Sequence, residues 1–225
     1  MINNVSFQRV SDDWFVLIIN RNMARFRLVK PGTVADGKND NVISCDHDFL
    51  ICDTPVSANL WRNVMYCNDT FQQEEVPITK ISWQQVSDFL TKLYDLTRIR
   101  FRIPTETEWE FAAYGGNTSS LFVYSGSNCL NDVSYFHIHE DGTDNSMSYQ
   151  LHQMKLFLPN ELGLYDMTGN INEFCQETKI QDGVSFHLGK GGAWYNLEKP
   201  SFYNSAKHWL QDDWCDRGWG LRLTI

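Results

Sequence analysis

The sequence predicts an α+β fold with small antiparallel sheets, about two to three helices and much irregular structure. Short apolar runs dominate the amino-terminal part of the chain, which is typical of strands. Two capping boxes, which begin at Ser82 and Thr105, each precede a helical pattern of apolar residues. Much of the second half follows neither the helix period nor the strand period and is rich in Ser, Asn, Asp and Gly.

The first predicted strands are the runs W-F-V-L-I-I at 14–19 and F-R-L-V at 26–29. The turn-forming pair Pro31–Gly32 and the polar run Asp36–Asn41 interrupt the pattern, and Phe49–Cys52 is another short apolar strand. The run at 14–19 follows two aspartates and lacks a small-residue cleavage site, so we interpret it as a buried strand and not as a signal peptide.

Three segments carry helix signals. The pair Thr54–Pro55 suits an N-cap and a first helical position. A capping box at 82–85 and apolar residues at helical spacing predict a helix to about Leu96. The capping box at 105–108 begins a helix that the Gly115–Gly116 pair stops.

The remaining chain is predicted to be irregular over 117–158 and to close with two short strands, Lys190–Trp194 and Gly220–Ile225. An irregular segment of that length is uncommon inside a compact domain. The chain shows neither an internal repeat nor a linker, so we expect one domain over residues 1–225.

Composition excludes several classes of function. The chain has 225 residues and a formal net charge of −9, which disfavours nucleic acid because phosphate binding needs a basic patch. No run approaches the roughly 18 apolar residues that a membrane helix needs. The six cysteines form no C-x-x-C pair, and without an export signal we expect free, mostly buried thiols in place of disulfides. These features favour a cytoplasmic or phage-particle location over Sec-dependent secretion.

The segment Asn160–Cys175, N-E-L-G-L-Y-D-M-T-G-N-I-N-E-F-C, follows neither pattern. Gly163 and Gly169 indicate sharp bends or a positive φ, and its Asn and Asp side chains favour hydrogen bonds within turns. We therefore expect a compact "polar knot", defined as residues 160–175, that pins separate parts of the domain together.

Five segments in order carry a family resemblance. They are I-S-W-Q-Q-V-S-D-F-L (81–90), R-I-P-T-E-T-E-W-E-F-A-A-Y-G-G (102–116), the polar knot, G-K-G-G-A-W (189–194) and G-L-R-L (220–223). They resemble the motifs of the formylglycine-generating-enzyme-like family, also called the sulfatase-modifying-factor family. The resemblance implies a C-type-lectin-like fold, with residues 1–48 matched only loosely.

The resemblance does not imply the family's oxidase activity. Its oxidases convert a substrate cysteine to formylglycine with two cysteines that hold copper(I), a soft ion that prefers thiolates. In the corresponding stretch, Gly191–Lys207, this chain has no cysteine, and Cys215 is the only one beyond it. We therefore expect no copper and no enzyme of this type.

The resemblance also implies a metal hypothesis, since family members can hold calcium at the polar knot. The corresponding ligands are the side chains of Asp166 and Glu173 and the carbonyls of Gly169 and Ile171. Carboxylates and turn carbonyls are the hard oxygen ligands that calcium takes. In the alternative, the two carboxylates cap backbone N–H groups and no ion binds.

The segment Trp194–Trp219 mixes aromatic, amide and acidic side chains without a regular period. Rigid aromatics with short polar neighbours are typical of binding surfaces. The candidate ligand-binding residues are Tyr195, Asn196, Phe202, Tyr203, Asn204, His208, Trp209, Asp212, Asp213 and Trp214. Trp194 and Trp219 are expected in the core instead.

One branch of the family, the variable proteins of diversity-generating retroelements, presents altered residues in this region to bind diverse ligands. The chain resembles that branch in its short length and its missing copper cysteines. Lys199, Lys207, Trp209 and Trp214 depart from it, because adenine-directed mutagenesis of asparagine codons does not readily produce Lys or Trp. Either these are scaffold positions or the chain is a fixed relative.

Other chemical sites have weaker signals. The H-I-H run at 137–139 could contact a metal but lacks a third ligand in step, and Asp46-His47-Asp48 is expected to be a solvated turn. The glutamates at 106, 108 and 110 could serve as general acids, but glutamate at a helix start also completes the cap and complements the dipole.

The leading hypothesis is a non-catalytic ligand-binding or display protein of bacterial or phage origin. Its partner would be a protein or another cell-surface ligand, not nucleic acid, without membrane insertion; an oligomer is compatible with the sequence. One alternative is an enzyme that uses other residues around the same cleft. A second is a structural subunit of a larger assembly.

Overall fold

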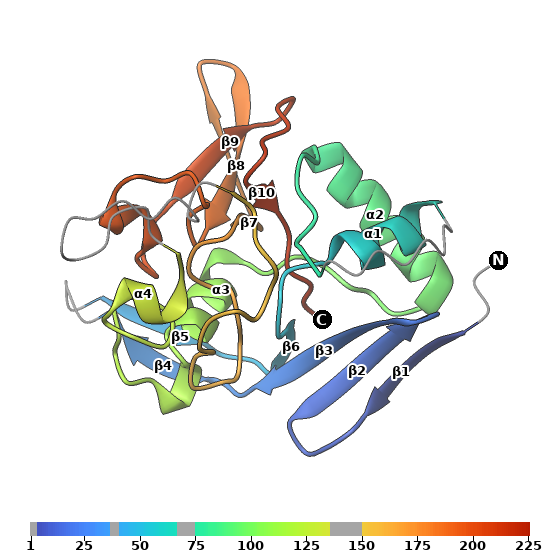
Figure 1. Ribbon diagram of the computed structural model, residues 1–225, viewed down its shortest axis with the longest axis horizontal. Helices are drawn as coiled ribbons and strands as arrows, with labels where there is room; N and C mark the ends of the chain where they lie inside the picture. Colours follow the sequence, from blue (N-terminus) through green and yellow to red (C-terminus); the bar gives the residue numbers. More distant parts are fainter. Residues whose placement is uncertain (1–3, 37–40, 67–74, 136–149) are drawn as a thin grey trace.

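The computed structural model describes residues 4–36, 41–66, 75–135 and 150–225. It is an α+β structure of small sheets, short helices and long connections, as the sequence predicts (Figure 1).

The first sheet comes from the amino-terminal strands β1 (Val5–Arg9), β2 (Trp14–Ile19), β3 (Asn22–Val29) and β6 (Phe49–Cys52). They pair antiparallel in the order β1-β2-β3-β6. The predicted strands at 14–19, 26–29 and 49–52 are therefore confirmed. Two further strands, β4 (Gly32–Ala35) and β5 (Val42–Cys45), form a separate hairpin.

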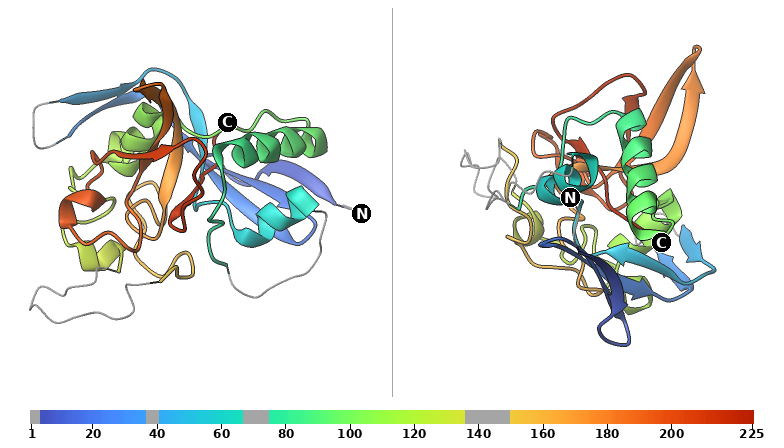
Figure 2. Two further views of the ribbon diagram at one scale, coloured as in Figure 1. Left: turned by 90° about the horizontal axis from the view of Figure 1, so that it is seen from above. Right: turned by 90° about the vertical axis from the view of Figure 1, so that its right-hand side faces the viewer.

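Helices α1 (Ala58–Tyr66) and α2 (Trp83–Thr97) lie side by side over one face of this sheet (Figure 2). Their aromatic residues Trp61 and Phe89 stack with ring centroids 4.7 Å apart, and both rings are buried. The predicted capping box of α2 is confirmed, because Ser82 Oγ accepts from the Gln85 N–H and the Gln85 side chain accepts from the Ser82 N–H.

The predicted start of the first helix is wrong. Thr54 and Pro55 do not begin α1, because Val56 is held in extended backbone: its N–H donates to Leu221 O at 2.8 Å and its carbonyl accepts from Ile78 N at 2.8 Å. The cap is Ser57, whose Oγ accepts from the Leu60 N–H at 3.0 Å. Tertiary hydrogen bonds thus displace a local signal by three residues.

The second sheet has the order β10-β7-β8-β9. Its long hairpin of β7 (Asn172–Gln181) and β8 (Val184–Lys190) projects from the molecule (Figure 1). Asp182 and Gly183 make the turn with φ of 52° and 78°, the conformation that an Asp-Gly hairpin turn favours. Strand β9 (His208–Gln211) is an edge, and β10 (Trp219–Gly220) pairs parallel with β7.

The two closing strands differ from the prediction. Residues 190–194 are not a strand, because β8 ends at Lys190 and the next two residues, Gly191 and Gly192, take φ of 94° and 78°. Beyond β10 the chain makes only isolated bridges, in which Thr224 pairs with Ile51 and with Arg102. These bridges bring the carboxyl terminus between the first sheet and the segment that enters α3.

Helix α3 (Glu106–Ala113) has the predicted capping box, formed by Thr105 and Glu108. Its buried residues Trp109 and Phe111 belong to a second core that also contains Leu188 of β8 and Leu164 of the polar knot. The predicted irregular segment contains two short helical turns, η1 (Gly116–Thr118) and α4 (Leu130–Val133). A last turn, η3 (Lys199–Phe202), precedes β9.

Candidate functional site

The polar knot is buried and connects distant segments, as the sequence predicts. Asn160 reaches two of these segments, because its Nδ2 donates to Ala112 O at 2.8 Å and to Ser125 Oγ at 3.0 Å. Within the knot, its Oδ1 accepts from the N–H groups of Leu162 and Leu164. Positive φ values at Gly163 and Gly169 permit the turns. The knot therefore supports the sheet that carries the carboxyl-terminal segment.

A fully buried ion pair joins the knot to the carboxyl-terminal end of the chain. Arg222 donates to Glu173 through Nη2–Oε1 at 2.6 Å and Nε–Oε2 at 2.8 Å, and both side chains are 0% exposed. Trp109 Nε1 also donates to Glu173 Oε2 at 2.7 Å. Two carbonyl oxygens, of Cys52 and Tyr165, accept two further guanidinium hydrogens at 2.9 and 2.8 Å.

The groups proposed for calcium are near one another in sequence, but as arranged they do not fit the ion. Both oxygens of Glu173 already accept from Arg222, whose positive charge opposes a cation there. Asp166 Oδ2 accepts from the Lys155 N–H at 2.9 Å. Burial raises the pKa of Asp166 in spite of that hydrogen bond. Among the described residues no cluster of three or more His, Cys, Asp or Glu side chains could hold a metal. Calcium binding here is therefore a hypothesis that requires Glu173 to separate from Arg222.

The carboxyl-terminal segment divides into exposed and buried parts. The "C-terminal loop", residues 212–218, joins β9 to β10 and exposes Asp212, Asp213 and Trp214, the last to 61%. Its backbone is anchored, because Asp212 N donates to Ser185 O at 3.0 Å and Trp214 N donates to Gln211 O at 3.0 Å. These three predicted residues therefore lie together at the surface.

The base of the loop is joined to the segment after Gly192. Tyr195 Oη donates to Asp216 Oδ1 at 2.6 Å, and burial and this carboxylate raise the pKa of Tyr195. Arg217 lies over the ring of Trp194 at 4.6 Å, so Trp194 is half-buried and not in the core as expected. Trp219 is buried, as predicted. Asn196 is used locally, since its Oδ1 accepts from the Ala193 N–H at 2.6 Å.

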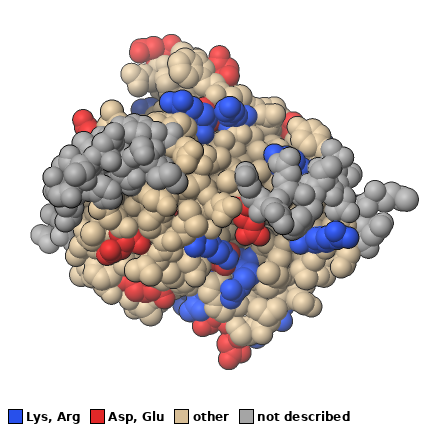
Figure 3. All heavy atoms as spheres, viewed as in Figure 1, with Lys and Arg blue, Asp and Glu red and all other residues tan. Residues whose placement is uncertain are grey.

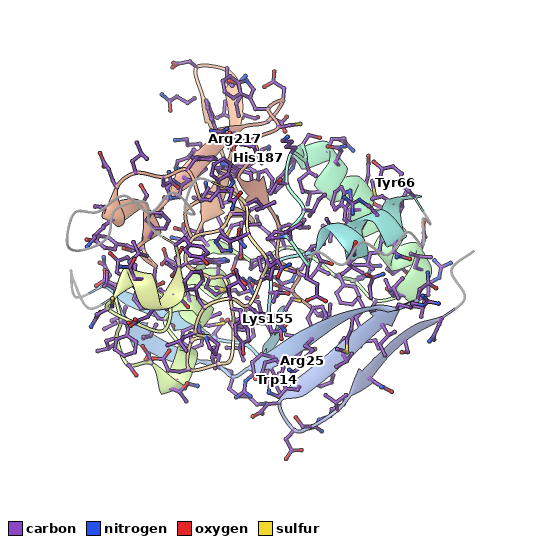
Figure 4. All side chains as sticks on the ribbon, viewed as in Figure 1. Trp14, Arg25, Tyr66, Lys155, His187 and Arg217 are labelled. Atoms are coloured by element: carbon purple, nitrogen blue, oxygen red, sulfur yellow. The ribbon has the colours of Figure 1, made fainter. Side chains whose placement is uncertain are left out.

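A buried histidine supports the loop from below. His187 of β8 stacks on Trp83 of α2 with ring centroids 3.9 Å apart, and its Nε2 lies 2.7 Å from Asp212 Oδ1 (Figure 4 shows His187 close to Arg217). Sequence reasoning missed this residue, whose signal was only a histidine in an apolar run. The contact ties the acidic start of the loop to helix α2.

Other predicted residues do not join the loop. Phe202 and Asn204 are corrected to interior positions, because each is only 1% exposed. Phe202 packs in a small core with Tyr124, and Asn204 Nδ2 donates to Phe122 O at 3.2 Å. Tyr203 contacts the Tyr124 ring at 5.6 Å.

The two candidate residues in β9, His208 and Trp209, are half-buried. His208 lies 2.9 Å from Ser201 O, and burial lowers its pKa. The ammonium nitrogen of Lys179 lies 4.3 Å from the centroid of the Trp209 ring.

A separate hollow of about 660 Å³ lies between α3, the β4–β5 hairpin and the segment before β9. Glu106, Glu110 and Lys207 line it, with Lys207 Nζ 2.8 Å from Glu106 Oε1. Glu110 bonds to the completely buried Lys190, and burial raises the pKa of Glu110 in spite of that lysine. The glutamates thus serve the ion pairs of α3, and Glu108 also completes the helix cap, as the structural alternative predicts.

The remaining histidine and cysteine predictions have mixed outcomes. His47 is exposed with its neighbours Asp46 and Asp48, yet it is not only solvated, because its Nε2 lies 3.0 Å from Glu108 Oε1. The H-I-H run and Cys67 lie outside the described residues. The five described cysteines are free, and three of them are buried. Burial raises the pKa of the Cys52 thiol to about 12, so it stays protonated.

Comparison with known proteins identifies the family and the fold of the chain. The family described as "Sulfatase-modifying factor enzyme 1-like domain" matches residues 20–225. The chain belongs to this family. In the solved structures, "Treponema denticola variable protein 1" superposes with a TM-score of 0.73 at 20% identity, over 93% of this chain and 98% of that one. This likeness shows the C-type-lectin-like fold.

Two curated relatives are more similar to the chain in sequence than this structure is. "Chaperone protein LppX" of Paenibacillus barcinonensis is 26% identical over 197 residues, which cover 65% of this chain and 69% of that protein. "Inactive C-alpha-formylglycine-generating enzyme 2" of Mus musculus is 27% identical over 174 residues, which cover 76% of this chain and only 53% of the mouse protein. One relative is named a chaperone and the other an inactive enzyme. Membership of the family therefore does not assign one activity to the chain. No helix within the described part of the chain is long and apolar enough to cross a membrane.

Proposed function

We propose that the protein is a non-catalytic binding protein that displays the C-terminal loop on a lectin-like scaffold, with another protein as its ligand. The observation that carries the proposal is an exposed tryptophan between acidic residues on an anchored backbone. Trp214 is 61% exposed, while hydrogen bonds to Ser185 O and Gln211 O hold the loop. Preorganisation of this kind lowers the entropy cost of binding, and tryptophan is enriched in binding hot spots.

The names of the relatives support a display role, but they do not name a ligand. The structural neighbour is named a variable protein and a curated relative is named an inactive enzyme. The stretch Gly191–Lys207, which corresponds to the copper-binding stretch of the family's oxidases, contains no cysteine. These points favour binding over oxidation of cysteine.

The proposal is tested by selecting a phage-displayed random peptide library on the immobilised protein. We expect Trp214→Ala to weaken the selected peptides by about 30-fold, the effect of a hot spot of about 2 kcal/mol. The matched control is Ile180→Ala on the β7–β8 hairpin, because Ile180 is also apolar and is 77% exposed. Equal loss in both variants, or no loss in either, would contradict a role for the loop.

The alternative, an enzyme, has one specific observation in its favour: the hollow beside α3 contains Glu110, whose pKa burial raises. Catalytic carboxylates often have raised pKa values, but so do carboxylates in buried ion pairs. Incubation with copper(I) and a cysteine-containing peptide in air, followed by mass spectrometry, tests the family's copper-dependent oxidation, which is separate from any non-copper chemistry of this hollow. We expect the cysteine to remain unchanged; formylglycine in the peptide would overturn the non-catalytic proposal.

The third hypothesis is that the protein is a structural subunit of a larger assembly, and it predicts a different environment for the C-terminal loop. The exposed residues of the C-terminal loop would then be covered by a second copy or by another subunit. Sedimentation velocity at several protein concentrations measures this, and a sedimentation coefficient that rises with concentration for the original protein but not for Trp214→Ala would favour assembly through the loop.

A further inference from the structure

A small cavity lies between β3, the segment that enters α1, and Lys155. Its volume is about 220 Å³, and its charged lining residues are Arg21, Arg25, Asp53, Glu75 and Lys155. None of the residues of the C-terminal loop lines it. We call this cavity the β3 pocket. Its residues come from parts of the chain that are far apart in sequence, so no local sequence motif predicts the pocket.

Of the described residues, an aromatic ring and not a carboxylate holds Arg25. In the β2–β3 ladder Trp14 is opposite Arg27 and diagonal to Arg25, so the three side chains share one face of the sheet. The guanidinium carbon of Arg25 lies 4.5 Å from the Trp14 ring centroid. Arg27 pairs with Asp13 at 3.2 Å, whereas within the described residues no carboxylate pairs with Arg25. Within the part of the chain that the structure describes, the hydrogen-bond donors of Arg25 are therefore available to a ligand.

The Trp14 ring is itself fixed from the other side. A Cβ atom on Gly163 of the polar knot would lie 3.1 Å from the ring, closer than an ordinary van der Waals contact, so the glycine backbone packs tightly against Trp14. The same knot residue has φ of 79°. Trp14 is thus a wall between the polar knot and Arg25, and it presents the arginine in one orientation.

Lys155 is placed by strained backbone. Its φ is 63°, in the left-handed region that residues with a Cβ adopt rarely. Its N–H donates to Asp166 Oδ2 at 2.9 Å, and its ammonium nitrogen lies 2.9 Å from Asp53 Oδ2. Asp53 is buried and accepts only one of the three ammonium hydrogens in that contact. Strain of this kind is found at functional sites, where neighbouring groups impose it.

The charge of the pocket is opposite to that of the chain. Of the described residues, three cations and two carboxylates line it, and one carboxylate, Asp53, is paired with Lys155, although the chain as a whole carries −9. Lys and Arg side chains gather near the centre of this face (Figure 3), and Trp14, Arg25 and Lys155 lie close together in the same view (Figure 4). Helix α1, whose amino terminus carries partial positive charge, begins at the pocket.

We propose that the β3 pocket binds a small oxyanion, a phosphate or carboxylate group, between Arg25, Arg21 and Lys155. Arginine recognises both groups through paired N–H···O bonds, and the ammonium of lysine adds a point charge. The volume is below the roughly 300 Å³ at which drug-sized ligands begin to fit. A single anionic group, free or at the end of a larger ligand, therefore suits it. This site is independent of the C-terminal loop.

The test is calorimetric titration of the whole protein with inorganic phosphate and, separately, with acetate, at constant ionic strength. We expect binding of at least one anion and a loss of about tenfold or more in affinity in Arg25→Ala. Arg100→Ala is the matched control, because Arg100 is also exposed and lies 5.4 Å over the ring of Tyr94, away from the pocket. A melting curve of each variant confirms that it is folded.

Each outcome decides the proposal. Binding of phosphate alone, or of acetate alone, supports the site and identifies its class of oxyanion, provided that Arg25→Ala weakens it and Arg100→Ala does not. Equal affinity in the original protein and Arg25→Ala would overturn it. Absence of heat and of any melting shift with both anions up to about 10 mM, a free energy near −3 kcal/mol, would overturn it as well.

Discussion

Arg222 is a charged residue of the interior, and its side chain is 0% exposed. It neutralises Glu173 and satisfies the carbonyls of Cys52 and Tyr165, so its loss leaves a buried carboxylate without its cation. We expect Arg222→Leu to lower the free energy of unfolding by about 3–5 kcal/mol. Urea unfolding measures it.

The control for this prediction is Arg100→Leu at an exposed position, which we expect to change the free energy of unfolding by less than about 0.5 kcal/mol. A loss below about 1 kcal/mol in Arg222→Leu would show that Glu173 finds other partners or becomes protonated without penalty.

Glu108 makes stability depend on acid pH. Burial alone would raise its pKa, but hydrogen bonds from Arg102, the Thr105 N–H and His47 outweigh burial and lower the pKa from 4.5 to about 2. A carboxyl group with a lowered pKa in the folded state contributes stability that is complete above its unfolded pKa. That stability, roughly 3 kcal/mol, is lost as the pH falls from about 4.5 through 2.

The measurement is the urea midpoint between pH 5 and pH 2 for the original protein and for Glu108→Gln. We expect Glu108→Gln to be less stable at pH 5 and to lose less stability on acidification. Parallel pH profiles for the two proteins would contradict the prediction. Asp95→Asn is the control, because Asp95 makes only an exposed ion pair with Arg98.

At the scale of the element, helix α2 depends on a cap that the sequence displays. Ser82 Oγ accepts from the Gln85 N–H at 3.2 Å, which satisfies one of the free N–H groups at the helix start. We expect Ser82→Ala to cost about 1 kcal/mol in the free energy of unfolding. Ser87→Ala, at an exposed position inside the same helix, is the control and should be neutral or slightly stabilising because alanine is the better helix former. Equal effects of both changes in urea unfolding would count against the cap.

At the scale of the whole molecule, the metal prediction can be decided by melting with chelator and with calcium. Because Arg222 already occupies the carboxylate of Glu173, we expect the melting temperature to stay unchanged in both conditions. A rise with calcium that Asp166→Asn abolishes would instead show that Asp166 and Glu173 rearrange around an ion. Bound copper in the purified protein would contradict the expected absence of the oxidase site.

Much of the fold could be predicted because its signals lie between neighbours in sequence. The capping boxes at Ser82 and Thr105, the apolar strand at 14–19 and the polar knot all depend on residues a few positions apart, and the structure confirms each. The β7–β8 hairpin was missed although its Asp182–Gly183 turn was readable, because the strands are irregular and half-exposed.

The candidate site was predicted less well, since composition does not report burial. The sequence by itself determined the family, the fold class and the absence of the paired cysteines, because each of these depends on motifs of residues that are close together in the chain. Only the tertiary structure decided that Trp214 is exposed while Phe202 is interior, that Arg222 pairs with Glu173, and that Arg25 and Lys155 share one pocket. Those outcomes depend on which distant segments exclude water from one another, and that is a property of packing, not of the order of the residues.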